Sequence, residues 1–123
     1  MAIDRADTLA RMMSHRLAAI IRTRDQDLAA EAMRAAIRGG FRVVEFTMNT
    51  PGALALIESF SADRDLVVGA GTVLTVEQAR SAVAAGARFI VSPVVEPTVI
   101  AAARELGAAT VPGTYSPTEM MQA

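Results

Sequence analysis

The stretch FRVVEFTMNTP, at positions 41–51, decides the fold of this chain. Its apolar residues predict a buried strand over 41–47, and Thr50-Pro51 predicts the N-cap and first position of a helix. Glu45 interrupts the apolar run with one carboxylate. A strand that carries a lone acid close to its C-terminal end indicates a site on a parallel sheet, where strand ends gather polar groups.

Four similar apolar runs flank this one, and helical periodicity follows each of them. The predicted strands lie at 17–23, 41–47, 65–70, 88–92 and 108–111. Strands that alternate with helices form a parallel sheet with right-handed crossovers. The chain is therefore predicted to be one α/β domain over residues 1–123, a (βα) TIM-type barrel with about five of its eight units. The first and last strands would be open edges, and a helix within residues 1–16 precedes the repeat.

Helix boundaries are marked by capping residues and glycines. Glycines at 39–40, 86 and 107 predict helix ends, and the apolar face of the first repeat helix is predicted from Leu28, Ala32, Met33, Ala36 and Ile37. Capping boxes begin at Thr75 and Ser116. The helix after Ser116 carries no stop signal, which fits either a short last helix or a fragment of a longer protein; we favour the fragment.

Composition excludes several classes of function. Aromatic residues make up 4% of the 123 residues and the net charge is −1, which argues against nucleic-acid binding by base stacking or by contacts with the phosphate backbone. It has no cysteine and a single histidine, so we expect no metal site and no cofactor. No apolar run is long enough for a membrane span, and charged residues interrupt the N-terminal region. A cytoplasmic protein that binds a small molecule is the expectation.

The ordered motifs VVEFTMNTP (43–51), VGAGTV (68–73), VSP (91–93) and PGT (112–114) closely resemble one known family. It is the 2-keto-3-deoxy-6-phosphogluconate aldolase / 4-hydroxy-2-oxoglutarate aldolase family of class I aldolases. The resemblance implies an eight-stranded barrel, a homotrimer, and cleavage of a 2-keto-3-deoxy-sugar-acid phosphate to pyruvate and glyceraldehyde 3-phosphate. It also implies a Schiff-base lysine on a later strand.

The same resemblance assigns roles to five positions in this sequence. Glu45 matches the catalytic acid/base, Thr72 and Pro93 match the pyruvate pocket, and Arg22 matches an arginine that faces anionic groups. Asn49 resembles the branch of the family that acts on the phosphogalactonate-type substrate. Each position also has a simpler structural explanation: an ion pair or solvation for Glu45, a tight turn for Thr72, strand termination for Pro93, an ion pair with a nearby aspartate for Arg22, and turn capping for Asn49.

The chain contains no lysine, although an imine requires a neutral amine. Arginine cannot replace it, because its pKa lies above about 12. The resemblance therefore implies that the nucleophilic lysine lies beyond residue 123. Two other interpretations stay open: a non-catalytic partial barrel that associates through its open edges, and a phosphate-sugar epimerase in which Glu45 removes a proton without an imine.

Overall fold

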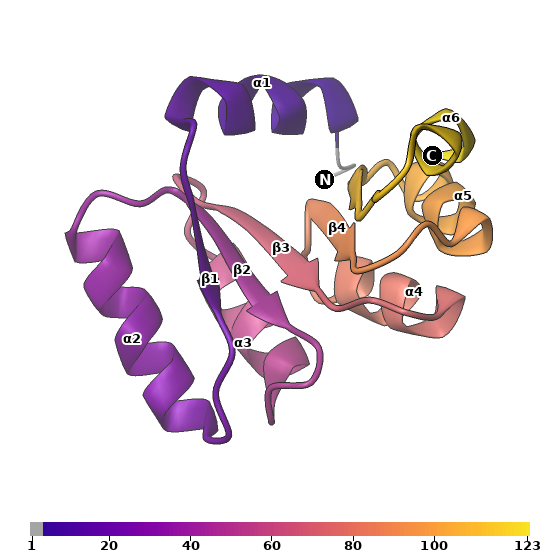
Figure 1. The fold of residues 1–123 in the computed structure, drawn as a ribbon. Helices are drawn as coiled ribbons and strands as arrows, with labels where there is room; N and C mark the ends of the chain where they lie inside the picture. Colours follow the sequence, from indigo (N-terminus) through magenta and orange to yellow (C-terminus); the bar gives the residue numbers. More distant parts are fainter. Residues whose placement is uncertain (1–3) are drawn as a thin grey trace.

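The computed structural model describes residues 4–123 and contains one parallel sheet, with strand order β1-β2-β3-β4-β5 (Figure 1). The strands are β1 (Ala18–Ile21), β2 (Val43–Thr47), β3 (Val67–Gly71), β4 (Phe89–Ser92) and β5 (Ala109–Pro112). The helices are α1 (Arg5–His15), α2 (Gln26–Arg38), α3 (Ala53–Ser61), α4 (Val76–Ala84), α5 (Pro97–Glu105) and α6 (Pro117–Gln122). This order confirms the predicted α/β fold, a partial barrel of five βα units.

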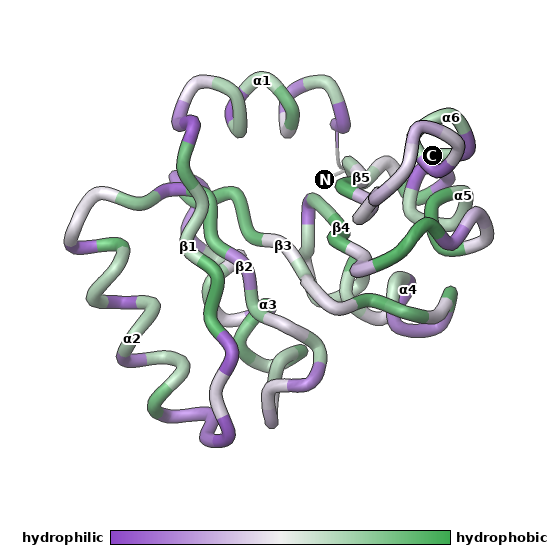
Figure 2. The backbone as a smooth tube through the Cα atoms, viewed as in Figure 1, coloured by the Kyte–Doolittle hydropathy of each residue, from purple (hydrophilic) through white to green (hydrophobic). Residues whose placement is uncertain are grey.

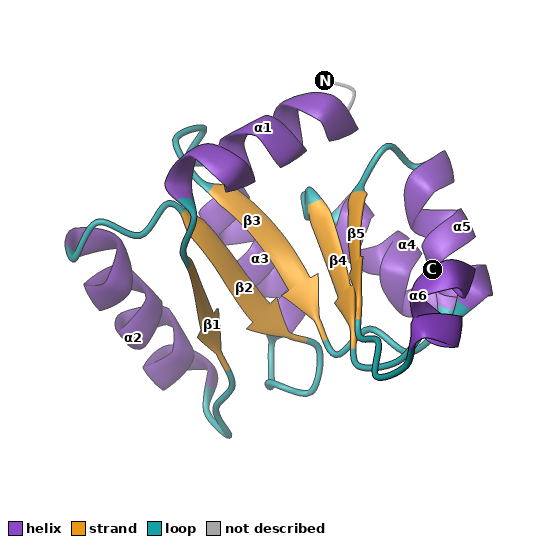
Figure 3. Cartoon of the chain, turned by 45° about the horizontal axis from the view of Figure 1, so that its top comes forward, coloured by secondary structure: helices purple, strands orange, loops and turns teal. Residues whose placement is uncertain are grey.

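Helices α2 to α5 cover one face of the sheet, and α1 crosses the end at which the strands begin (Figure 3). All neighbouring strands pair in parallel, so their C-terminal ends meet at the opposite edge. Within the described residues β1 and β5 each pair on one side only, as predicted. In Figure 2 the hydrophobic colour along β1 gives way to hydrophilic colour where the strand ends.

Alternation along β2 divides its side chains between two apolar clusters. Val44 and Phe46 belong to the large core between the sheet and the helices. Val43 belongs to a smaller cluster with Val67 and Phe89 on the other face, the concave side of the partial barrel. Glu45 and Thr47 alternate in step with Val43, so they share this concave face.

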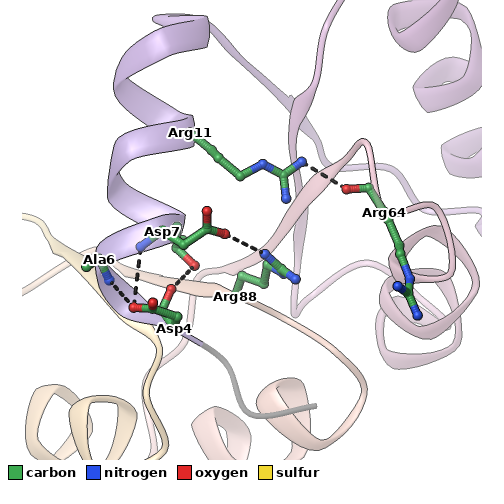
Figure 4. A network of polar contacts seen from close by, with 7 residues as sticks. Asp4, Ala6, Asp7, Arg11, Arg64 and Arg88 are labelled. Atoms are coloured by element: carbon green, nitrogen blue, oxygen red, sulfur yellow. Dashed lines mark hydrogen bonds and ion pairs between the residues drawn. The ribbon is translucent and has the colours of Figure 1, made fainter.

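Apolar and polar contacts attach helix α1 to the end of the sheet at which the strands begin. Met12 packs against the concave-face cluster. Arg88 Nη1 forms an ion pair with Asp7 at 3.3 Å, and Arg11 Nη2 donates to the Arg64 carbonyl at 3.0 Å (Figure 4). The predicted N-terminal helix of residues 1–16 is therefore present over Arg5–His15, while positions 1–3 of that prediction lie outside the described residues.

Three sequence predictions about helices were wrong. Leu28 was predicted to be part of the buried face of α2, but it is 55% exposed, whereas Ala29, Ala30 and Met33 are buried. Met33, Ala36 and Ile37 do pack in the core, as predicted. Leu28 does not, because it precedes Met33 by five residues, whereas Ala29 and Ala30 precede it by four and three and so share its face of the helix.

The second error concerns the start of α3. This helix begins at Ala53, its N-cap is Gly52 in the left-handed region at φ 71°, and no side chain caps it. Thr50 does not cap the helix, because its hydroxyl is buried and bonded to Thr47 and to the Thr23 amide. Thr75 caps α4 as predicted, but the Gln78 side chain accepts from the Leu74 amide and so does not complete the predicted capping box. Ser116 begins a full capping box at α6, as predicted.

Candidate active site

The C-terminal ends of β1, β2 and β3 bring three of the predicted site residues together. Glu45 lies on the concave face of β2 and is only 5% exposed. Arg22 follows β1 directly, and Thr72 follows β3 directly. The guanidinium of Arg22 links the three: it donates a hydrogen bond to Thr72 and acts on Glu45 through space, by electrostatic attraction. The strand order explains the meeting, because β2 lies between β1 and β3.

Two glycines on β3 make room for the side chains of the neighbouring strands. A Cβ added to Gly71 would collide with Oε1 of Glu45, and one added to Gly69 would collide with the ring of Phe89. The register pairs Glu45 with Gly69, so the acid crosses β3 on its concave side. The glycines in Gly69-Ala70-Gly71 therefore let side chains of the neighbouring strands lie close to the β3 backbone. The carboxylate of Glu45 occupies the space above Gly71.

Burial raises the pKa of Glu45 above its ordinary value, because the charged form loses solvation. The guanidinium of Arg22 acts in the opposite direction and is the smaller influence. The pKa of the Glu45 carboxyl is therefore higher than that of an exposed glutamate, and the nearby cation stabilises its anionic form. A group of this kind can both donate and accept a proton.

Thr72 adopts a backbone conformation that is unusual for its residue type. Its φ is 56°, in the left-handed region, where a β-branched residue is strained. The strained conformation accompanies a specific contact, in which Thr72 Oγ1 accepts from Arg22 Nη2 at 3.0 Å. Backbone strain concentrated at a polar cluster is typical of functional sites.

Asn49 and Pro93 lie at the same edge of the sheet, after β2 and β4, and both are exposed. Pro93 is close to the neighbouring strand end, since a Cβ at Gly113 would meet the Pro93 carbonyl, and Gly113 donates its amide to Ser92. The structure therefore groups Arg22, Glu45 and Thr72, and leaves Asn49 and Pro93 along the rim.

Sequence reasoning missed two hydroxyls beside this group. Thr47 is 1% exposed and Thr50 is 3% exposed, and their Oγ1 atoms lie 3.1 Å apart. The period-two pattern of the strand could have indicated Thr47, because it shares a face with Glu45. Nothing in the pattern singled out Thr50, which the sequence favours as a helix cap.

No metal centre is present among residues 4–123: no group of three or more histidine, cysteine, aspartate or glutamate side chains is close enough to hold an ion. Within the same residues, every helix is too short or too polar to cross a membrane. The polar groups that meet at the ends of β1, β2 and β3 are the Glu45 carboxyl, the Arg22 guanidinium and the Thr72 hydroxyl.

Comparison with known proteins places these features in a family. The sequence model for "KDPG and KHG aldolase" matches residues 9–123. A 2-dehydro-3-deoxy-phosphogluconate aldolase of Treponema pallidum is 46% identical over 77% of this chain and 46% of its own length. A probable 2-dehydro-3-deoxy-6-phosphogalactonate aldolase of Rhizobium meliloti is 38% identical over 90% of this chain and 53% of its own. The chain thus spans about half the length of these curated relatives.

A solved structure of the same family also resembles this chain. The KDPG aldolase of Legionella pneumophila, captured with pyruvate as a covalent carbinolamine intermediate, superposes with a TM-score of 0.82 at 31% identity. The match covers 94% of this chain and 56% of that one.

Proposed function

Since this chain belongs to the KDPG and KHG aldolase family, we propose that it provides the proton-transfer part of a class I aldolase site. The substrate would be a 2-keto-3-deoxy-sugar-acid phosphate, cleaved to pyruvate and glyceraldehyde 3-phosphate. The observation that carries the proposal is the buried Glu45 carboxyl above Gly71, with a raised pKa and the Arg22 guanidinium beside it.

Glu45 would act as the general acid and base. Forming an imine requires a proton to be delivered to a departing hydroxyl, which leaves as water. Cleavage of the carbon–carbon bond then requires removal of the proton from the 4-hydroxyl, and the enamine that remains takes up a proton at the carbon that becomes the pyruvate methyl group. One carboxyl with a raised pKa can perform these transfers in sequence, because it is readily protonated and deprotonated. Its position on the concave face, at the C-terminal ends of the strands, is where barrel enzymes carry their chemistry.

Arg22 and Thr72 would bind the keto acid. A guanidinium can hold a carboxylate through two parallel hydrogen bonds, and here it already shares a hydrogen bond with the Thr72 hydroxyl. Pro93 would supply an apolar wall, and Asn49, exposed on the rim, would contact the sugar-acid hydroxyls. Asn49 would thereby take part in the choice between gluconate and galactonate stereochemistry.

The amine for the Schiff base would come from outside these 123 residues, because the sequence has no lysine. The carbinolamine in the Legionella relative supports a covalent route for the family. By the same resemblance we propose a homotrimeric assembly for the complete site; light scattering of the chimera described next would report it.

A chimera tests the proposal. Residues 1–123 would be fused to the complementary C-terminal part of the Rhizobium relative, and cleavage of the two sugar-acid phosphates would be followed by pyruvate release. We expect cleavage of one substrate, and a Glu45→Gln chimera with kcat lower by about 10²- to 10⁴-fold.

Borohydride reduction in the presence of pyruvate would add the mass of a pyruvyl group to a lysine of the appended segment. Glu58→Gln, at an exposed glutamate of α3, is the matched control and should leave kcat unchanged. A folded chimera with neither cleavage nor a trapped adduct would contradict the proposal, as would full activity in the Glu45→Gln chimera.

A further inference from the structure

The pairing of β1 with β2 stops before the site residue that β1 carries. The last matched positions are Ile21 and Phe46. Arg22 and Thr23 lie beyond the ladder, and β1 is an edge strand that pairs on one side only within residues 4–123. An arginine after the end of an edge strand would be mobile unless another contact fixed its backbone.

Thr50 supplies such a contact. The Thr23 amide donates to Thr50 Oγ1 at 3.3 Å, so a side chain continues the tether from β1 to the β2 segment after the backbone ladder has ended. Thr50 is itself held by Thr47, whose Oγ1 lies 3.1 Å away. Both threonines are almost fully buried, and this fixes their rotamers.

Thr23 is fixed on its other side as well. Its hydroxyl donates to the Asp25 carbonyl, and Asp25 is the N-cap of α2 through a 2.7 Å hydrogen bond from the Leu28 amide. Arg22 therefore stands between the β1 ladder and Thr23, which is bonded to the turn after β2 and to the N-cap residue of α2. This arrangement limits where its guanidinium can lie relative to Thr72 and Glu45.

We propose that the buried hydroxyl pair of Thr47 and Thr50 is a positioning element for Arg22. It tethers the Thr23 amide and so keeps the guanidinium against Thr72 and beside Glu45. The two threonines do not touch the substrate. The proposal rests on the proposed function for its purpose only, since the contacts themselves are independent of any reaction.

A hydroxyl pair could instead serve only to satisfy its own polar atoms in the core. The two roles differ in their effect on the pKa of Glu45. A purely structural pair affects the free energy of unfolding and leaves the electrostatics of Glu45 unchanged. A positioning pair alters the titration of Glu45, because its loss lets the cation move away.

The test uses the 123-residue chain with ¹³C-labelled glutamate, and NMR follows the Glu45 carboxyl through a pH titration. Thr50→Val keeps the side-chain shape but removes the hydroxyl, and Thr50→Ser keeps the hydroxyl. Arg22→Gln gives the shift expected when the guanidinium is lost altogether. Amide exchange at Thr23 is measured in the same samples.

We expect Arg22→Gln to raise the pKa of Glu45, and Thr50→Val to raise it in the same direction by a smaller amount. Thr50→Ser should titrate like the parent. The Thr23 amide should exchange faster in Thr50→Val than in Thr50→Ser. Thr47→Val, which leaves the Thr50 hydroxyl in place, should shift Glu45 in the same direction and serves as the deciding variant if Thr50→Val does not fold.

A folded valine variant in which Glu45 titrates as in the parent would overturn the proposal. So would an unmoved Glu45 in Arg22→Gln, or equal shifts in Thr50→Ser and Thr50→Val. None of these measurements needs turnover. An inactive chimera together with the expected shifts would remove the proposed aldolase function and leave the positioning role standing.

Discussion

Arg22 donates a hydrogen bond to Thr72 at 3.0 Å across 50 positions of sequence, and this contact spans the end of the strand that carries Glu45. It joins the first and third strands over the second. The guanidinium stabilises the ionised form of Glu45, while burial of the carboxyl opposes ionisation and dominates. The pKa of Glu45 is thus set by two opposing effects, desolvation and the charge of Arg22, and mutation can change each of them separately.

Neutralising Glu45 should stabilise the fold at high pH. Its pKa is raised in the folded state, so the protonated form favours folding below the ordinary value of 4.5, and this contribution is lost as pH rises through the folded pKa. Glu45→Gln should therefore raise the free energy of unfolding near pH 8, with a smaller gain near pH 4. Urea unfolding at both pH values measures this, and equal gains at the two would contradict it.

The two glycines of β3 should respond differently to alanine. At Gly71 the added Cβ meets the end of the flexible Glu45 side chain, which can move aside. At Gly69 it meets the ring of Phe89, which is 1% exposed and packed in the concave-face cluster. Overpacking a core costs roughly 1–3 kcal/mol, so Gly69→Ala should lose that much stability and Gly71→Ala less than about 1 kcal/mol.

Gly71→Ala should nevertheless displace the Glu45 carboxyl and lower kcat in the chimera. Chemical denaturation and kinetics of the two variants are the measurements. A Gly71→Ala chimera with unchanged kcat would show that Glu45 does not need the space above this glycine.

Replacing Thr72 with glycine should stabilise the fold, although it removes a hydroxyl group from the site. Its left-handed φ of 56° strains a β-branched residue by about 1–3 kcal/mol, and glycine adds about 0.5–1 kcal/mol of backbone entropy cost. Thr72→Gly should raise the free energy of unfolding by up to about 1 kcal/mol. The control is Thr110→Gly within β5, where loss of strand preference should lower stability. A marked destabilisation by Thr72→Gly would mean that its hydrogen bond outweighs the strain.

The ion pair that attaches α1 should make a small contribution that depends on salt. The side chain of Asp7 is 53% exposed and that of Arg88 is 25% exposed, so solvent screens the pair. Asp7→Asn should cost about 0.2–1 kcal/mol at low ionic strength and less at high salt. Asp27→Asn in α2 is the comparison, since Asp27 forms no ion pair in the described residues. A salt-independent loss would point to packing of α1 instead.

Local patterns in the sequence predicted most of the architecture. Strand runs and glycine stops place all five βα units, and the capping residues Thr75 and Ser116 act as expected because their hydrogen bonds reach only a few residues along the chain. Thr50 shows the limit of such signals. A threonine before a proline favours a helix cap, yet tertiary contacts with Thr23 and Thr47 take its hydroxyl instead.

The site itself was predictable only in part. Glu45 stands out as a carboxylate in an apolar strand, and strand order brings Arg22 and Thr72 to the same edge. The Arg22–Thr72 hydrogen bond and the left-handed conformation of Thr72 depend on geometry between separate strands, which no single segment of sequence encodes.

We propose that Glu45 is a proton-transferring carboxyl rather than a permanently ionised one. The most direct measurement is the pH titration of its ¹³C carboxyl signal in the unmodified chain. We expect a midpoint above 4.5, the ordinary value for the group, because burial raises the pKa of Glu45. A midpoint at or below that value would show that Arg22 outweighs burial, and Glu45 would then lack the protonated form that the proposed chemistry requires.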